Sequence, residues 1–179
     1  MIASHILEGK YVNLRPVEEE DSEFILTIRN DYSISKYLPK LNVTVDEQKS
    51  WISKQRVDKE SYYFLIESAE GKRLGTISYY DIVGNHGESG RVCSIGNATQ
   101  NVEALILFYN YLFYELNVEY VTIWVYEDNK PVLSLKQSIG FTWNGNGIDD
   151  SGMKYRKGII NVAQYEKKIP LIKKMLKLG

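Results

Sequence analysis

The chain has 179 residues, of which 44% are hydrophobic, and its formal net charge is -1. That length and apolar content suffice for one domain with a sizeable core, so we expect a single domain over residues 1–179. The near-neutral charge argues against a protein that binds nucleic acid through net positive charge, although it leaves room for a local basic patch.

Cysteine content and hydropathy exclude further classes of protein. One cysteine, Cys93, excludes an intrachain disulfide and a metal site built from several cysteines. No apolar run approaches the ~20 residues that span a bilayer, and residues 1–5 lack the basic start and apolar core of a secretory signal. We therefore expect a cytoplasmic protein with no metal, no nucleic-acid partner and no membrane partner.

The first half of the chain carries strand and helix patterns. Residues 10–17 favour a strand that stops at a proline, which lacks a ladder donor. The acidic run 18–21 is typical of a helix start, and Thr-Val-Asp-Glu at 44–47 is a capping-box pattern that opens a second helix. Residues 61–68 and 73–83 are β-branched and aromatic, and the Glu-Gly between them predicts a hairpin.

Residues 91–126 carry the most informative pattern. A short strand is predicted over 91–95 and a strictly alternating strand over 118–126, with a broadly apolar helix between them over 102–116. A strand, a helix and a strand of these lengths form parallel neighbours with a right-handed crossover. The helix N-terminus then lies at the carboxyl end of the first strand, where free N–H groups favour an anion such as phosphate.

The last third completes the predicted fold. Asn129-Lys-Pro131 opens a helix that ends at Gly140, because proline suits a first turn and glycine suits a helix end. The remaining predicted elements are a strand from 141, a flexible loop at 145–152, a last strand at 159–165 and a basic tail helix at 171–178. Together they predict a mixed α/β fold, mostly antiparallel, with one parallel β-α-β crossover.

Three segments have a spacing that is typical of one enzyme superfamily. They are Gly9-Lys-Tyr-Val-Asn-Leu-Arg-Pro16, Ile28-Arg-Asn30, and Asn129 to Phe141, which is similar to N-x-x-A-x-x-L-x-x-x-x-G-F. On these segments the chain resembles the GNAT superfamily of acetyl-CoA-dependent N-acetyltransferases. The spacing is closest to the branches that acetylate nucleotide-linked amino sugars and ribosomal-protein N-termini. The resemblance implies a GNAT-like fold with acetyl-CoA as co-substrate.

The resemblance also implies where acetyl-CoA binds. Its pantetheine arm pairs with the strand of Val92, Cys93, Ser94 and Ile95, and its pyrophosphate meets N–H groups at the next helix start. Relatives usually carry Q/R-x-x-G-x-G/A there, whereas residues 96–101 hold one glycine and are about four residues short. The cofactor residues expected in this loop are Gly96, Asn97, Ala98, Thr99 and Gln100. The alternative interpretation is a polar helix cap without a ligand.

Glu88 is the expected catalytic base. Glu88-Ser-Gly90 resembles the E-x-G that begins the corresponding strand in many relatives, and the reaction needs a base that takes a proton from the acceptor ammonium. The alternative interpretation is a solvated turn carboxylate. His86 is a second titratable candidate, although its Gly/Asn turn is typical of a surface residue.

The general acid is not assigned from the sequence. Many relatives carry a tyrosine seven residues after the asparagine that corresponds to Asn129, and this chain has Lys136 there. We count Asn129 and Lys136 as cofactor-binding candidates; the lysine either contacts phosphate oxygens or faces solvent. Tyr80 and Tyr126 are other candidates for the acid, but both fall in strands, where an aromatic residue is ordinary packing.

Arg29 and Asn30 are the expected substrate-binding residues. In the amino-sugar branch an Arg-Asn pair at this place is associated with the acceptor pocket, and both groups bind phosphate or sugar hydroxyls well. The alternative is a helix end that uses both residues for capping. We expect acetyl transfer to a small-molecule primary amine by direct attack, favouring a nucleotide-linked amino sugar. A protein N-terminus and a non-catalytic CoA-binding module are the alternatives, and the oligomeric state stays open.

Overall fold

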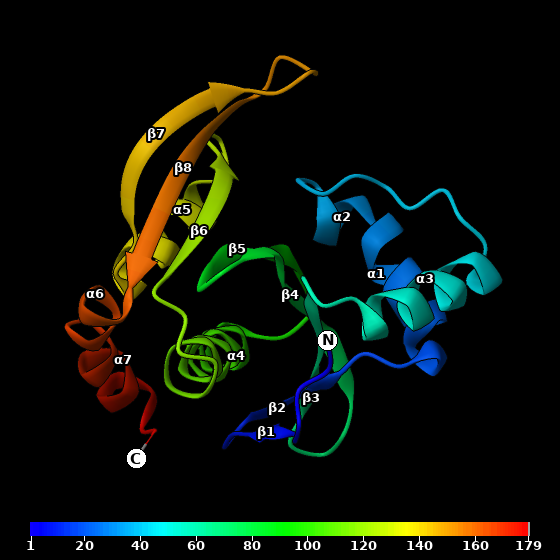
Figure 1. Cartoon of the computed structure of the whole chain (residues 1–179), viewed down its shortest axis with the longest axis horizontal. Helices are drawn as coiled ribbons and strands as arrows, with labels where there is room; N and C mark the ends of the chain where they lie inside the picture. Colours follow the sequence, from blue (N-terminus) through cyan, green and yellow to red (C-terminus); the bar gives the residue numbers. More distant parts are fainter. Residues whose placement is uncertain (179) are drawn as a thin grey trace.

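The structure, a computed structural model, describes residues 1–178, which form a mixed sheet with helices on both faces (Figure 1). In this range the eight strands follow the order β1-β2-β3-β4-β5-β6-β8-β7. The strands are β1 (Leu7–Glu8), β2 (Val12–Pro16), β3 (Tyr62–Ser68), β4 (Arg73–Val83), β5 (His86–Ser94), β6 (Tyr120–Tyr126), β7 (Thr142–Ile148) and β8 (Lys154–Asn161). All neighbours are antiparallel except β5 and β6, so the predicted fold class is confirmed.

Helices cover both faces of the central strands. In Figure 1, α1, α2 and α3 lie on one side of β4 and β5, and α4 lies on the other. The helices are α1 (Ser22–Asn30), α2 (Tyr32–Ser35), α3 (Val45–Val57), α4 (Ala98–Asn110), α5 (Lys130–Ile139), α6 (Val162–Glu166) and α7 (Ile169–Leu176). None of the helices in the described range is long and apolar enough to cross a membrane.

The core has two parts that meet at β3. Tyr62, Phe64 and Ile66 pack into the larger cluster with α4, whereas Tyr63 and Leu65 pack into a smaller cluster with α1 and α3. Successive side chains of a strand point to opposite faces, so this alternation divides them between the two clusters. The uninterrupted apolar run in β3 thus reflects a strand that is buried on both faces.

Local signals fixed several boundaries as predicted. The Thr44 hydroxyl accepts a hydrogen bond from the Glu47 N–H, and the Glu47 carboxylate accepts one from the Thr44 N–H, which completes the capping box of α3. Helix α5 has its proline in the first turn and ends at Gly140, whose φ is 124°.

The end of the chain departs from the prediction. The expected loop at 145–152 is a strand as far as Ile148, and the expected last strand at 159–165 is β8, which begins earlier and gives way to α6 after Asn161. Gly147 lies opposite Tyr155 of β8, and a Cβ there would collide with the tyrosine ring. The glycine therefore serves close cross-strand packing, which sequence alone does not separate from a flexible loop. The tail helix α7 also begins two residues earlier than predicted.

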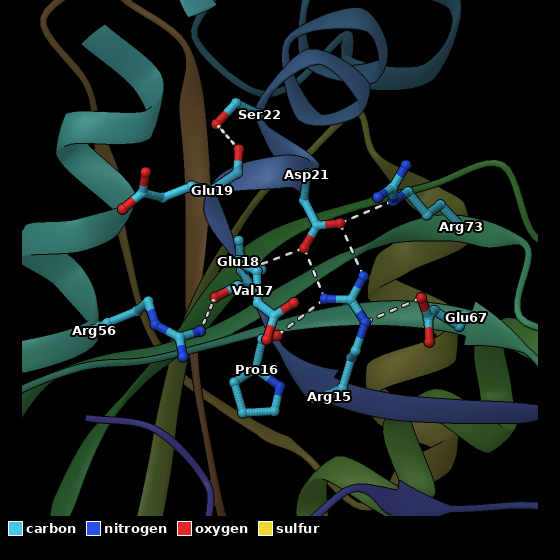
Figure 2. A network of polar contacts seen from close by, with 10 residues as sticks. All are labelled: Arg15, Pro16, Val17, Glu18, Glu19, Asp21, Ser22, Arg56, Glu67 and Arg73. Carbon is cyan, nitrogen blue, oxygen red and sulfur yellow. Dashed lines mark hydrogen bonds and ion pairs between the residues drawn. The ribbon is translucent and has the colours of Figure 1, made fainter. Parts of the chain in front are cut away.

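A buried carboxylate ties the start of α1 to the sheet (Figure 2). Both oxygens of Asp21 accept from the Arg15 guanidinium of β2, at 2.7 and 2.9 Å, and one also accepts from Arg73 of β4 at 2.8 Å. The Glu18 N–H donates to the same carboxylate at 2.9 Å. Arg15 also donates to Glu67 of β3 at 3.0 Å. The network therefore links three strands to the first turn of the helical layer.

Candidate active site

The candidate site lies where β5 and β6 part. The two parallel strands pair from His86 and Tyr120 to Glu88 and Thr122, and the pairing stops there. A cavity of about 730 Å³ opens beyond this point, between β5, β6, α3, α5 and the loop after α2. A volume of this size is typical of a small-molecule site. The parallel crossover predicted from the sequence therefore forms the opening of a cavity.

At this opening, Glu88 and Ser89 present a carboxyl and a hydroxyl group on opposite faces of the sheet. Glu88 hydrogen-bonds Tyr80 of β4, and the next side chain, Ser89, hydrogen-bonds Tyr109 of α4 on the opposite face. Both residues line the cavity. The cavity therefore reaches the two faces of the sheet through the gap between the strands.

The Glu88 carboxyl is half-buried and held by one strong hydrogen bond. The Tyr80 hydroxyl donates to it at 2.5 Å. Burial, helped by the negative charge of Asp81, raises the pKa of Glu88 above its ordinary value. These two effects outweigh the Tyr80 hydrogen bond, the weaker interaction with Trp124 and the positive charge of Arg91, which all lower it. The guanidinium of Arg91 stacks 4.2 Å above the Tyr80 ring. A carboxylate with a raised pKa is a more basic proton acceptor than an exposed one.

His86 lies outside the cavity, and Tyr126 lines it but bonds a loop carboxylate. His86 stacks on Tyr120 with 4.6 Å between ring centroids and is not among the cavity-lining residues. Its predicted turn contains Gly84 and Asn85 only, because β5 already begins at His86. The Tyr126 hydroxyl donates to Asp149 at 2.6 Å, and this bond, with burial, raises the pKa of Tyr126 to about 12. Tyr126 thus fastens the end of β6 to the β7–β8 turn.

Among the described strands, one edge of β5 is free beyond the opening. Beyond Glu88, no strand in the described range pairs with β5 on its β6 side. Its backbone N–H and C=O groups there need hydrogen-bond partners. A bulge at Arg91, whose φ is 52°, bends the strand at the cavity. The strand predicted over 91–95 is thus the second half of β5, followed by one extended residue.

The four predicted pantetheine residues differ in exposure. Val92 and Ile95 are exposed, and Ser94 is half-buried with its hydroxyl donating to Asn101 at 2.6 Å. Cys93 is buried, its thiol lies 3.4 Å from the Ile28 carbonyl, and burial raises the pKa of Cys93 to about 11. Cys93 thus offers a ligand its backbone only.

The start of α4 is capped more fully than the sequence predicts. Asn97 and Gln100 form a reciprocal capping box, in which each side chain accepts from the other residue's N–H at 3.0 Å. The Gly96 N–H donates to the Ser94 hydroxyl. Within the described range, the N–H groups of Ala98 and Thr99 have no acceptor. Of the five loop residues predicted to bind the cofactor, Ala98 and Thr99 therefore offer an anion free N–H donors, whereas the N–H groups of Gly96, Asn97 and Gln100 are taken.

The structure separates the predicted substrate-binding pair. Arg29 is buried, lines the cavity and donates to the Pro39 carbonyl at 2.9 Å, and its Nε has no hydrogen-bond partner among the described residues. The Asn30 amide instead bonds both backbone groups of Leu41, at 2.9 and 3.0 Å. Asn30 is not a cavity residue and holds the loop that closes the cavity.

Asn129 and Lys136 both line the cavity from the α5 side. The Asn129 side chain does not cap α5, although its carbonyl accepts from the Leu133 N–H. Lys136 is only 5% exposed, and its ammonium donates to the Tyr109 hydroxyl at 2.7 Å. The solvent-facing alternative for Lys136 is therefore wrong.

Sequence reasoning missed much of the cavity wall. Six aromatic side chains line it, from five different elements: Tyr37, Trp51, Tyr63, Tyr80, Trp124 and Tyr126. Trp51 and Trp124 are more than one-third exposed, which is unusual for tryptophan. This exposure marks them as cavity residues, but it is visible only in the structure and not in the sequence. Ser89, next to the predicted base, was missed because nothing local marks a serine that meets α4.

The sheet thus opens between two parallel strands, and a half-buried carboxyl with a raised pKa lies at the opening. Residues 12–142 match the family model described as the acetyltransferase (GNAT) domain, and the chain belongs to this family. It is an N-acetyltransferase that uses acetyl-CoA as the acetyl donor. A sequence search of curated proteins found no match.

Solved structures share the fold over most of their length. Apo FdhC, described as a nucleotide-linked sugar GNAT, is 26% identical with a TM-score of 0.81, over 99% of this chain and 100% of that one. The spermidine N-acetyltransferase from Vibrio cholerae in complex with CoA and spermine is 21% identical with a TM-score of 0.76, over 87% and 98%. A GNAT-family acetyltransferase from Bacillus anthracis is 19% identical with a TM-score of 0.74, over 88% and 98%.

Proposed function

We propose that this acetyltransferase acetylates the primary amine of a nucleotide-linked amino sugar. The observation that carries the proposal is the cavity wall, in which six aromatic rings line the same cavity as the Glu88 carboxyl. Flat rings stack on bases and on the apolar faces of sugars. The likeness to a nucleotide-linked sugar GNAT over the full length of both chains supports the same acceptor class.

Charged residues in the cavity wall favour this acceptor over a polyamine. Arg29, Arg91 and Lys136 are balanced by three carboxylates, Glu47, Asp81 and Glu88. A polyamine carries several positive charges and is bound best where carboxylates are in excess. A nucleotide diphosphate is bound by cationic donors, and a guanidinium with an unsatisfied N–H, such as Arg29, is a suitable phosphate or hydroxyl donor.

In the proposed reaction Glu88 acts as the general base. It takes a proton from the acceptor ammonium, so that the neutral amine attacks the acetyl carbonyl directly. Acetyl-CoA supplies the activated acetyl group. The cavity holds both reactants in the gap between β5 and β6, where proximity replaces a collision in solution. Tyr80 keeps the carboxylate aimed at the gap through its 2.5 Å hydrogen bond.

A thiol-release screen tests the acceptor. The wild-type protein is incubated with acetyl-CoA and one of four acceptor sets: UDP- and dTDP-linked amino sugars, the same sugars without the nucleotide, spermidine, and short peptides. We expect the highest kcat/KM for a nucleotide-linked sugar and a large loss when the nucleotide is removed. Equal rates with the free sugar, or a preference for spermidine or peptides, would contradict the proposed acceptor.

A second experiment tests the cofactor loop, and it needs no acceptor. We infer that the N–H groups of Ala98 and Thr99 bind the pyrophosphate at the start of α4. Thr99→Pro deletes one of these two donors and disfavours helical geometry at Ala98, so a folded variant should lose acetyl-CoA affinity in isothermal titration. Thr99→Ala is the control and should cost about 1 kcal/mol or less. Equal affinity in wild type and a folded Thr99→Pro would place the pyrophosphate elsewhere.

A further inference from the structure

Three buried polar side chains form a continuous hydrogen-bonded chain behind the cavity. The Lys136 ammonium of α5 lies 2.7 Å from the Tyr109 hydroxyl of α4, which in turn lies 2.9 Å from the Ser89 hydroxyl of β5. The three residues are 5%, 0% and 4% exposed. Lys136 and Ser89, at the two ends, both line the cavity.

The chemistry of the three groups sets the direction of the chain. A lysine ammonium only donates hydrogen bonds, so the Tyr109 oxygen accepts from Lys136. The Tyr109 O–H is then available to donate to Ser89, and the Ser89 O–H is left to point into the gap between the strands. When Ser89 gives its proton to a group in the gap, Tyr109 therefore gives its own proton to Ser89. Lys136 then gives a proton to Tyr109.

The surroundings of Lys136 contain rings and no counter-charge. In the described range no carboxylate lies within ion-pair distance of it. Its ammonium instead lies 5.1 Å from the centre of the Tyr109 ring and 5.4 Å from that of Phe141. The other titratable group packed on Tyr109 is Tyr165 of α6, whose hydroxyl is held by the Ile106 carbonyl and Asn110. A buried cation without a carboxylate partner is costly, and the two rings and one hydrogen bond offset only part of that cost.

The position of the chain complements that of the proposed base. Glu88 and Ser89 are successive residues of β5, so they meet the same gap from opposite faces of the sheet. A thioester held in that gap has the carboxylate on one side and the Ser89 hydroxyl on the other. We propose that Ser89, supplied by Tyr109 and Lys136, protonates the CoA sulfur as it leaves.

The proposal rests on the proposed function of Glu88 as base, and its protons balance. The amine nitrogen forms the new bond to the acetyl carbon, the C–S bond breaks, and its electron pair stays on sulfur. Sulfur takes a proton from Ser89, which is refilled through Tyr109 from Lys136. The amine gives up two protons through Glu88 to water, and water returns one to Lys136. The net products are the amide, CoA thiol and one proton.

The ionisation of bound CoA thiol tests this inference without an acceptor. The donors that protonate the sulfur also stabilise its thiolate, so the thiol of bound CoA should ionise at lower pH than that of free CoA. Thiolate absorbance is followed against pH, as the difference between CoA-bound and desulfo-CoA-bound protein, which cancels Cys93 and the tyrosines. Lys136→Met and Tyr109→Phe should each raise the thiol pKa toward the value in free CoA.

Tyr165→Phe is the matched control, because Tyr165 is equally buried and its hydroxyl bonds away from the chain. It should leave the thiol pKa unchanged. With any amine that wild type acetylates, Lys136→Met should lower kcat by roughly 10²-fold while the Kd of acetyl-CoA stays within about threefold. An unchanged thiol pKa in both folded variants would overturn the proton chain. Since that readout needs no acceptor, it is independent of the acceptor proposed above.

Discussion

Asp21 and Glu88 are acidic residues that each bond a side chain of β4, at opposite ends of that strand, yet their surroundings differ in kind. Asp21 is fully buried and accepts four hydrogen bonds, three of them from arginines (Figure 2). Glu88 is half-buried beside an open cavity and accepts one, from Tyr80. The first carboxylate is completely satisfied by the protein, whereas the second keeps capacity for a substrate.

The two pKa shifts follow from this difference. Burial raises the pKa of Asp21, but hydrogen bonds from Arg15 and Glu18 and the charges of Arg15 and Arg73 outweigh it, so the net pKa is below its ordinary value. For Glu88 burial prevails, and the pKa lies above its ordinary value. A satisfied carboxylate stabilises the fold, and an unsatisfied one is available as a base.

Asp21→Asn should cause the largest loss of stability. It removes the charge that pairs Arg15 and Arg73 while keeping the shape of the side chain, and breaking a buried ion pair in this way costs about 3 kcal/mol. Urea unfolding measures the change. Glu67→Gln, which weakens one 3.0 Å contact of Arg15, is the control and should cost about 1 kcal/mol. A loss below 1 kcal/mol in Asp21→Asn would show that the network does not anchor the helical layer.

The opposite pKa shifts of Asp21 and Glu88 predict opposite responses of stability to pH. Because the folded-state pKa of Asp21 is lowered, its stabilisation is complete above the unfolded pKa and is lost as pH falls through the folded value. The gap between wild type and Asp21→Asn should therefore narrow in urea unfolding below about pH 4. Glu88 has a raised pKa, so Glu88→Gln should gain on wild type as pH rises. A constant gap at all pH values would contradict both assignments.

Tyr80→Phe should have a smaller effect, on activity. It removes the hydrogen bond that favours the Glu88 carboxylate, so the pKa of Glu88 rises further. On the acid side of the profile kcat/KM should fall by about tenfold, which corresponds to about 1.4 kcal/mol, and it should recover at higher pH. Tyr126 lines the same cavity, but its hydroxyl bonds Asp149 and not Glu88. Tyr126→Phe should therefore leave the pH profile of kcat/KM unchanged. A uniform loss at every pH would point to a different role for Tyr80.

Local signals explain which parts of the fold were predictable. The capping box of Thr44 and Glu47, the proline of α5 and Gly140 each act within one turn, and the sequence shows them directly. The strand at Gly147 was not predictable, since it depends on Tyr155 in another strand.

The site residues likewise fall into two groups, those that a local motif reveals and those that depend on contacts between distant elements. Glu88 and Arg29 were found through their motifs, and both line the cavity. Asn30 belongs to the expected motif, but its side-chain amide hydrogen-bonds the backbone of Leu41, eleven residues further along the chain. The link between Lys136, Tyr109 and Ser89 joins a helix, a helix and a strand, so no spacing in the chain reveals it.

The central claim is that Glu88 is the base that activates the acceptor amine. The most direct measurement is kcat/KM against pH for wild type and Glu88→Gln, with Asp81→Asn as the control carboxylate in the same cavity. Asparagine suits the left-handed backbone at position 81, where φ is 52°. We predict that wild-type kcat/KM rises with pH as Glu88 ionises. Glu88→Gln should lower it roughly 10²-fold and abolish that rise. Asp81→Asn should keep the rate and the rise, with the rise moved to lower pH because the Asp81 charge helps to raise the pKa of Glu88. Wild-type rates with the rise intact in Glu88→Gln would contradict the account.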